Sequence, residues 1–148
     1  MATTLTARLV LALAATLLAG ACARSQGTQA PAAQASTPGA GVDQNLATCS
    51  DIGLDAVSRI AACTAVIDDG DASPHVRAIA LNNRGVDRSQ QGDKDGAIAD
   101  FTAAIGFNPN YDAAFYNRAR AWRDKGHEVK ADADSAEAVR LNPALKGR

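Results

Sequence analysis

Hydrophobic residues divide the chain into three zones. Residues 9–18 form a mostly apolar run, residues 23–41 carry no hydrophobic side chain larger than alanine, and the remainder has hydrophobic and polar positions at helical spacing. This last pattern predicts a succession of packed helices, including one over residues 56–67. Ser73 followed by Pro74 is typical of the start of another helix.

The helical zone repeats with a period of 34 residues. A shift of 34 brings ten identical pairs into register: Ala80 and Ala114, Asn83 and Asn117, Arg84 and Arg118, Gly92 and Gly126, Ala97 and Ala131, Ala99 and Ala133, Asp100 and Asp134, Ala104 and Ala138, Asn108 and Asn142, and Pro109 and Pro143. A period of this length is typical of stacked helical hairpins. The glycines of this set are placed to end one helix, and the prolines to stop the next.

Hydrophobic side chains near helical spacing in both repeats are expected to form the core. They are Leu81, Ile98, Phe101, Ile105, Phe115, Trp122, Val129 and Val139. Small residues such as Gly85 and Ala97 are expected where two helix axes approach closely.

The repeats resemble tetratricopeptide repeats, and segments 82–85, 93–101 and 141–143 are similar to those of exported bacterial proteins of that class. The resemblance covers about residues 44–145. It implies an all-α fold, a short right-handed superhelical stack of antiparallel helix hairpins. The expected units are a degenerate first hairpin at 44–77 and regular repeats at 78–111 and 112–145, giving six helices in three hairpins.

The beginning of the chain is typical of an exported protein. Arg8, the apolar run and the small residues before position 22 predict a secretory signal peptide at residues 1–21. A permanent transmembrane helix is the weaker alternative, because the apolar run is too short. Residues 22–43, rich in Ala, Gln, Ser and Pro, predict a flexible tether.

The segment before Cys22 resembles the lipobox of bacterial lipoproteins, so Cys22 is the lipidation candidate. The alternative is ordinary cleavage, which leaves Cys22 as a free or mixed-disulfide thiol. Ala23 follows where Asp would suggest retention in the inner membrane. In a Gram-negative host the resemblance therefore implies a lipid anchor on the periplasmic side of the outer membrane; without lipidation the protein would be secreted and soluble.

The other two cysteines, Cys49 and Cys63, are expected to form a disulfide, which an exported location permits. If residues 53–55 turn the chain between two helices, both cysteines lie seven residues from Ala56 and face one another. Two buried thiols are the alternative.

Two arginine–aspartate pairs have equivalent spacing in the two repeats. Arg84 and Asp100 each lie eight residues from Gly92, and Arg118 and Asp134 each lie eight residues from the glycine of their own repeat. Such positions meet in an antiparallel hairpin. We therefore expect two structural ion pairs, with a ligand-binding role for the arginines as the alternative.

The resemblance implies that the first helices of successive hairpins line a concave groove. The family's groove positions correspond here to Ile79, Asn82, Val86, Ser89, Gln90, Ala113, Tyr116, Arg120, Arg123 and Asp124. The candidate partner-binding residues are Asn82, Val86, Tyr116, Arg120 and Arg123. A tyrosine flanked by arginines suits an extended peptide that carries a carboxylate, and a merely solvated basic face is the alternative.

Charge and motifs favour a binding protein over an enzyme. The chain has 15 Lys and Arg against 16 Asp and Glu, a net charge of −1, without a long basic run, so nucleic acid is not the expected partner. No catalytic, cofactor or metal motif is recognised. We expect an adaptor for an unidentified envelope protein or peptide. The alternatives are a self-associating structural lipoprotein, as in a homodimer, and a non-catalytic accessory subunit of a periplasmic enzyme complex.

Overall fold

The structure, a computed structural model, describes residues 40–147, whose regular elements are all helices, with no strand among them. The elements are α1 (Ala40–Ser50), α2 (Ala56–Asp68), α3 (Pro74–Gln90), α4 (Lys94–Phe107), α5 (Asp112–Asp124), α6 (Glu128–Leu141) and the 3-10 turn η1 (Pro143–Leu145). The predicted all-α fold with six helices is confirmed. The expected signal peptide and Cys22 lie outside the described residues.

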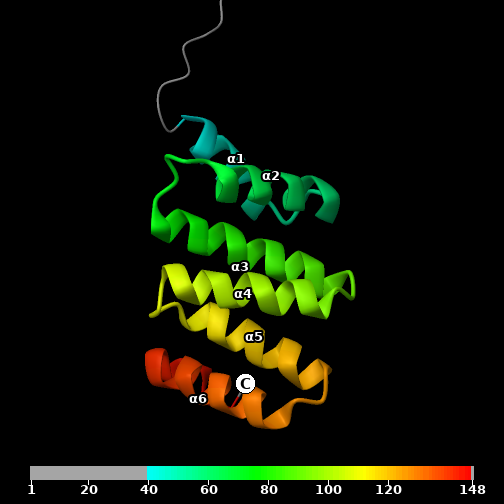
Figure 1. The fold of residues 1–148 in the computed structure, drawn as a ribbon, viewed down its shortest axis with the longest axis vertical. Helices are drawn as coiled ribbons and strands as arrows, with labels where there is room; N and C mark the ends of the chain where they lie inside the picture. The colour runs from blue at the N-terminus through cyan, green and yellow to red at the C-terminus, as the bar shows by residue number, and fades with distance from the viewer. Residues whose placement is uncertain (1–39, 148) are drawn as a thin grey trace, which may run out of the picture. The chain divides into compact units, whose positions relative to one another are not determined.

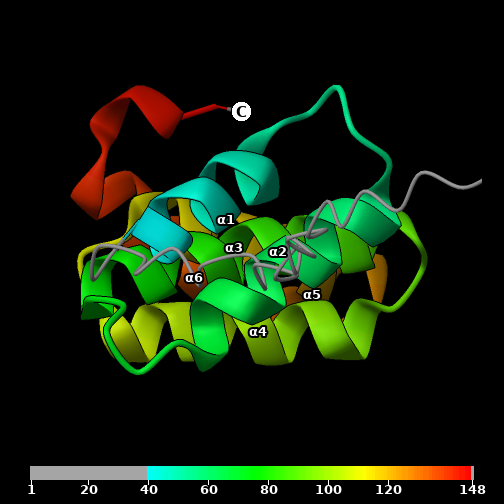
Figure 2. The same ribbon diagram turned by 90° about the horizontal axis from the view of Figure 1, so that it is seen from above.

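Consecutive helices pack against one another in chain order, and Figure 1 shows them as successive layers. In addition, α1 contacts α3 and α3 contacts α5. Among the described residues, α2, α4 and α6 make no contacts of this kind with one another. Figure 2, along the stack, shows α1 on one side and α4 on the other. None of these helices is both long and apolar enough to cross a membrane.

Local signals set the helix boundaries. The Ser73 hydroxyl accepts a hydrogen bond from the backbone N–H of Val76, and Pro74 stands in the first turn of α3, as predicted. Asp55 and Asp93 cap α2 and α4 in the same way. Gly92 has a φ of 89°, a left-handed conformation that favours glycine and lets the chain turn from α3 into α4.

Helix α1 begins at Ala40, inside the segment 22–43 that was expected to be a flexible tether. The reason is Val42, which is only 6% exposed and belongs to a buried cluster with Val66 and the two cysteines. Because Val42 is buried, the helix also includes the two small residues before it, Ala40 and Gly41. The Ala- and Gly-rich composition of this segment did not indicate a helix, because the beginning of α1 is stabilised by tertiary contacts of Val42.

The core is built from small residues around a few large ones. Phe101 is 1% exposed and lies over Gly85, where an added Cβ would be 2.6 Å from the phenylalanine ring. Any side chain at Gly85 would therefore push α3 away from α4. Leu81 and Ile98 are buried, as predicted.

The second repeat is less completely buried than predicted. Phe115, Trp122 and Val139 are only partly buried. Val129 is 86% exposed, so its predicted place in the core is wrong. The buried stripe of α6 is Ala131, Asp134 and Ala138, and Val129 lies on another side of the helix.

The two expected arginine–aspartate ion pairs are present. Arg84 donates to both carboxylate oxygens of Asp100, at 2.7 and 3.0 Å, and also to the Thr64 hydroxyl of α2 at 3.0 Å. Arg118 likewise donates to Asp134 at 2.7 and 2.8 Å and to Thr102 of α4 at 3.0 Å. Each arginine therefore connects its own hairpin to the preceding one.

Two further links involve the first hairpin. One lies within it, and the other connects it to the second hairpin. Cys49 and Cys63 form the predicted disulfide, with their Cα atoms 4.8 Å apart and both side chains buried. Sequence reasoning missed the second link, an ion pair between Arg59 of α2 and Asp87 of α3, in which Arg59 Nε lies 3.1 Å from both carboxylate oxygens. The disulfide joins α1 to α2, and the ion pair joins α2 to α3.

Replacing Asp100 by Asn should lower the free energy of unfolding by about 3 kcal/mol, because it leaves a largely buried arginine without its counter-charge. The loss should be smaller for Asp134→Asn, since Asp134 pairs with one arginine whereas Asp100 also accepts from Arg88. Urea denaturation measures both. The control Asp132→Asn, an exposed aspartate, should change stability little; equal stability of all three variants would contradict a structural role.

Reduction of the disulfide should lower the free energy of unfolding by about 3 kcal/mol in the chain-entropy account of cross-links. The measurement is denaturation with and without reductant, compared with the Cys49→Ala, Cys63→Ala double variant. The double variant should match the reduced protein and should not respond to reductant. A reductant effect that persists in the variant would show that the cross-link is not its cause.

Candidate partner-binding groove

Three recesses follow one another along the stack. The first, of about 130 Å³, is lined by Cys49, Ser50, Ile52, Arg59, Asn83, Val86, Asp87 and Gln90. The second, of about 150 Å³, is lined by Val86, Ser89, Gln90, Lys94, Phe101, Asn117, Arg120 and Asp124. The third, of about 350 Å³, is lined by Tyr116, Ala119, Arg120, Arg123, Ser135, Ala138, Val139, Leu145 and Gly147.

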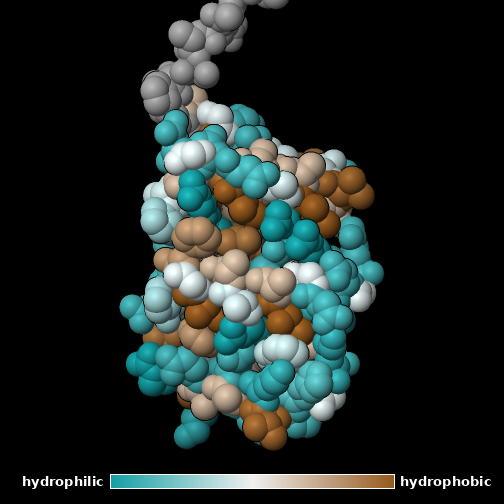
Figure 3. All heavy atoms as spheres, in the orientation of Figure 1, coloured by the Kyte–Doolittle hydropathy of each residue, from teal (hydrophilic) through white to brown (hydrophobic). Residues whose placement is uncertain are grey.

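Neighbouring recesses adjoin one another, because they share lining residues. Val86 and Gln90 line both the first and the second, and Arg120 lines both the second and the third. We call this row the groove. On the face shown in Figure 3, hydrophobic residues form separate patches bordered by hydrophilic ones, so this face offers no single broad apolar surface.

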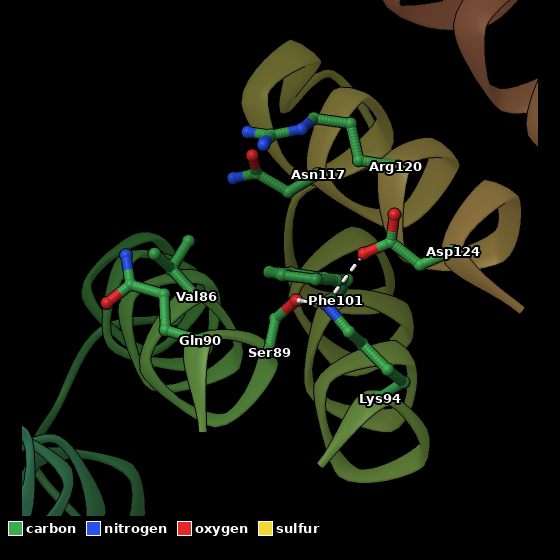
Figure 4. A pocket seen from close by; sticks show the side chains of 8 residues that line it. All are labelled: Val86, Ser89, Gln90, Lys94, Phe101, Asn117, Arg120 and Asp124. Atoms are coloured by element: carbon green, nitrogen blue, oxygen red, sulfur yellow. Dashed lines mark hydrogen bonds and ion pairs between the residues drawn. The ribbon is translucent and has the colours of Figure 1, made fainter. Parts of the chain in front are cut away.

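The second recess lies at the centre of the groove (Figure 4). One wall comes from α3, with Val86 and Gln90, and the opposite wall from α5, with Asn117 and Arg120. The ring of Phe101, from α4, lies between the two walls and is almost completely covered. The lining of the recess is therefore mostly polar, with amide and guanidinium groups at its rim.

One end of the second recess is closed by a neutral ion pair. Lys94 Nζ lies 2.6 Å from Asp124 Oδ2 and 3.0 Å from the Ser89 hydroxyl. This hydrogen bond from Lys94 lowers the pKa of Asp124 below its ordinary value, so the carboxylate is ionised at neutral pH. The pair joins the beginning of α4 to the end of α5.

The rim shared by the second and third recesses carries Arg120, a cation that is not held in an ion pair as Lys94 is. Arg120 is exposed, and its guanidinium carbon lies 6.0 Å from the centre of the Tyr116 ring. Arg120 forms no ion pair within residues 40–147. Arg123 is partly engaged, with Glu128 and Asp132 each at 3.5 Å. Positive charge is therefore available at the Arg120 rim.

Asparagines join the first helices of neighbouring hairpins. Asn117 of α5 donates to the Asn82 side chain of α3 at 2.9 Å. Asn83, the repeat equivalent of Asn117, donates to Ser50 at the end of α1 at 3.2 Å. These bonds fix the spacing of α1, α3 and α5 beneath the groove.

The structure brings together four of the five candidate binding residues. Val86 and Arg120 line the second recess, and Tyr116, Arg120 and Arg123 line the third. Asn82 is 6% exposed and supports the groove from below by holding Asn117.

In the second recess, three residues were not among the predicted groove positions: Lys94, Phe101 and Asn117. Asn117 carried a usable signal, because it repeats Asn83 after 34 residues. Phe101 was assigned only to the core. Lys94 gave no signal, because its partner Asp124 lies 30 residues away in the chain.

Within residues 40–147, no three His, Cys, Asp or Glu side chains are grouped so as to hold a metal ion. The groove supplies hydrogen-bond donors and acceptors beside a smaller number of apolar side chains. This arrangement can bind an extended chain segment by its backbone and side chains.

Comparison with known proteins gives no further guide to the role of the groove. No protein-family model matches this chain, and no curated protein is significantly similar to it.

Proposed function

We propose that this protein is a tetratricopeptide-type adaptor that binds a short segment of another envelope protein in the groove. The observation that carries the proposal is the row of three adjoining recesses along α1, α3 and α5. An extended segment can follow such a row and place side chains in successive recesses. In this proposal the chain is exported and anchored through lipid on Cys22.

The packing pattern supports the stacked-hairpin arrangement of this proposal. Direct contacts within the set α1, α3 and α5, and their absence within α2, α4 and α6 of the described region, are expected when the first helices occupy the inner side of a curved array. The fit of Phe101 over Gly85 and the 34-residue period both agree with the same repeat class.

The groove is short, so the affinity for one segment should be modest. Two regular repeats and one shorter hairpin give three recesses, of which the largest is about 350 Å³. A membrane anchor would offset this weakness by keeping the adaptor at high effective concentration beside its partner. We infer that tethering and groove binding act together.

Photo-cross-linking in intact cells tests the adaptor proposal. A cross-linking residue at Gln90, which is exposed at the groove, should form adducts with a partner. The same residue at Ala99, exposed on α4 away from the three recesses, is the matched control and should form fewer. The double change Tyr116→Ala, Arg120→Ala should abolish the Gln90 adducts without altering the circular dichroism spectrum. Adducts that are equal at both positions and survive the double change would place the binding surface elsewhere.

Exposed hydrophobic residues favour one second candidate, a self-associating envelope component. Ile52 is 94% exposed and Val57 is 72% exposed in the first hairpin, and Val129 is exposed on α6. Such residues could join copies of the chain end to end. This candidate needs no foreign segment in the groove.

Light scattering of the purified protein separates the two candidates. The adaptor should keep the mass of one chain as its concentration rises. Self-association predicts a mass that grows with concentration and returns to that of one chain in the variant Ile52→Ser, Val57→Ser. A growing mass that is insensitive to these substitutions would exclude these residues as the contact.

A further inference from the structure

We infer that the turn between α1 and α2 is a second interaction surface, which binds a basic, aliphatic segment of a partner protein. Aliphatic side chains of that segment cover Ile52, Leu54 and Val57. Its Lys or Arg side chains pair with Asp51 and Asp55. The inference goes beyond the proposed groove binding and does not depend on it. Exposed apolar side chains, an ordered backbone and unpaired carboxylates carry it.

Large exposed hydrophobic side chains are concentrated at this turn. Among the described residues, Ile52 is 94% exposed, Leu54 39% and Val57 72%, all within a short stretch of sequence. Figure 2 shows that the loop between α1 and α2 projects from the helices. The other large exposed hydrophobic residues, Phe107 and Val129, occur singly on α4 and α6. Single exposed hydrophobic residues are ordinary, whereas a group of them on a projecting loop indicates a contact surface.

Hydrogen bonds hold the turn in one conformation. The Asp51 side chain accepts a hydrogen bond from the Gly53 N–H at 2.9 Å, and the Asp51 carbonyl accepts one from the Leu54 N–H at 3.1 Å. The guanidinium of Arg59 donates to the Leu54 carbonyl oxygen, and Asp55 caps α2. The apolar side chains are therefore presented by an ordered backbone, and binding costs little further ordering of the turn.

The turn is acidic and has no free cation of its own. Neither Asp51 nor Asp55 forms an ion pair within the described region. The one basic residue in α1, α2 or the turn between them is Arg59, which is paired with Asp87 of α3. Hydrogen bonds from Ser58 lower the pKa of Asp55 below its ordinary value, so this carboxylate is ionised at neutral pH. Apolar side chains beside two unpaired carboxylates complement aliphatic side chains flanked by cations.

The same charge disfavours other occupants of the turn. Anionic lipid headgroups and acidic segments would be repelled by the two carboxylates. A symmetric contact between two copies of the turn would bring four carboxylates around one apolar patch, and like charges at close range are costly. A basic segment gains both apolar burial and charge pairing, so it is the occupant that the turn fits.

Fluorescence anisotropy with the full chain and defined peptides tests the inference. The probe is a labelled peptide with the core Lys-Leu-Leu-Lys, and its counterparts carry Gln or Glu in place of both lysines. The Lys peptide should bind at least about tenfold more tightly than either counterpart, because charge-assisted contacts with carboxylates add to the burial of the leucines. A Lys-Ser-Ser-Lys peptide should also bind more weakly, because it lacks the aliphatic contact.

Variants of the turn locate the binding surface. The double change Ile52→Ser, Val57→Ser should weaken binding of the Lys peptide at least about tenfold, because it removes the exposed apolar contact. The double change Asp51→Asn, Asp55→Asn should reduce the affinity for the Lys peptide to that for the Gln peptide. Asparagine keeps the turn and the helix cap, since its side-chain oxygen still accepts hydrogen bonds. Circular dichroism checks that both variants remain folded.

Two matched controls lie on α6. Val129→Ser changes a similarly exposed valine, and Asp132→Asn removes the charge of an exposed aspartate. Both should leave binding of the Lys peptide within about twofold, since exposed distant charges are screened. The groove variant Tyr116→Ala, Arg120→Ala should also retain binding, because neither of its residues belongs to the turn.

The outcomes separate this inference from the adaptor proposal. Absence of binding by the Lys peptide, its equal binding with the Gln peptide, or equal effects of turn variants and controls would overturn the basic partner. Loss of binding in the groove variant alone would place the peptide in the groove, against our inference. Selective loss in the turn variants would support the turn even if the Gln90 adducts were absent in cells and the groove adaptor failed. A mass that rises with concentration and falls in Asp51→Asn, Asp55→Asn would identify a second copy of the chain as the occupant and overturn the inference.

Discussion

A buried arginine shared by three helices is the interaction on which the stack depends. Arg84 pairs with Asp100 in its own hairpin and also donates to Thr64 of the hairpin before it. Arg118 makes the equivalent contacts one repeat later. A largely buried guanidinium is costly unless its donors are satisfied, so the hairpin and its junction with the preceding hairpin must form together. The repeat thereby couples folding within a hairpin to stacking between hairpins.

The first hairpin is held differently from the other two. No ion pair joins α1 to α2 in the described part of the chain, and the disulfide between Cys49 and Cys63 joins them instead. The junction with α3 uses Arg59 and Asp87. A covalent cross-link suits this position, because the end hairpin has a neighbour on one side only among the described helices.

Packing of the core determines the shape of the groove. Gly85 lets Phe101 approach α3, and the same phenylalanine then contributes to the second recess. The bond between Asn82 and Asn117 holds the inner helices together. Arg120, in contrast, forms no ion pair within residues 40–147 and lies beside the Tyr116 ring.

The sequence alone determined the features that depend on local geometry and on the repeat: the helices, the Ser73 cap, the pairing of Arg84 with Asp100, and the disulfide. Each of these features can be inferred from the spacing of residues, either along one helix or on the two sides of a turn. Only the tertiary structure decided the start of α1, the exposure of Val129 and the pair formed by Lys94 and Asp124. These depend on which faces of neighbouring helices meet, and that arrangement is set by side-chain packing between hairpins rather than by spacing along the chain.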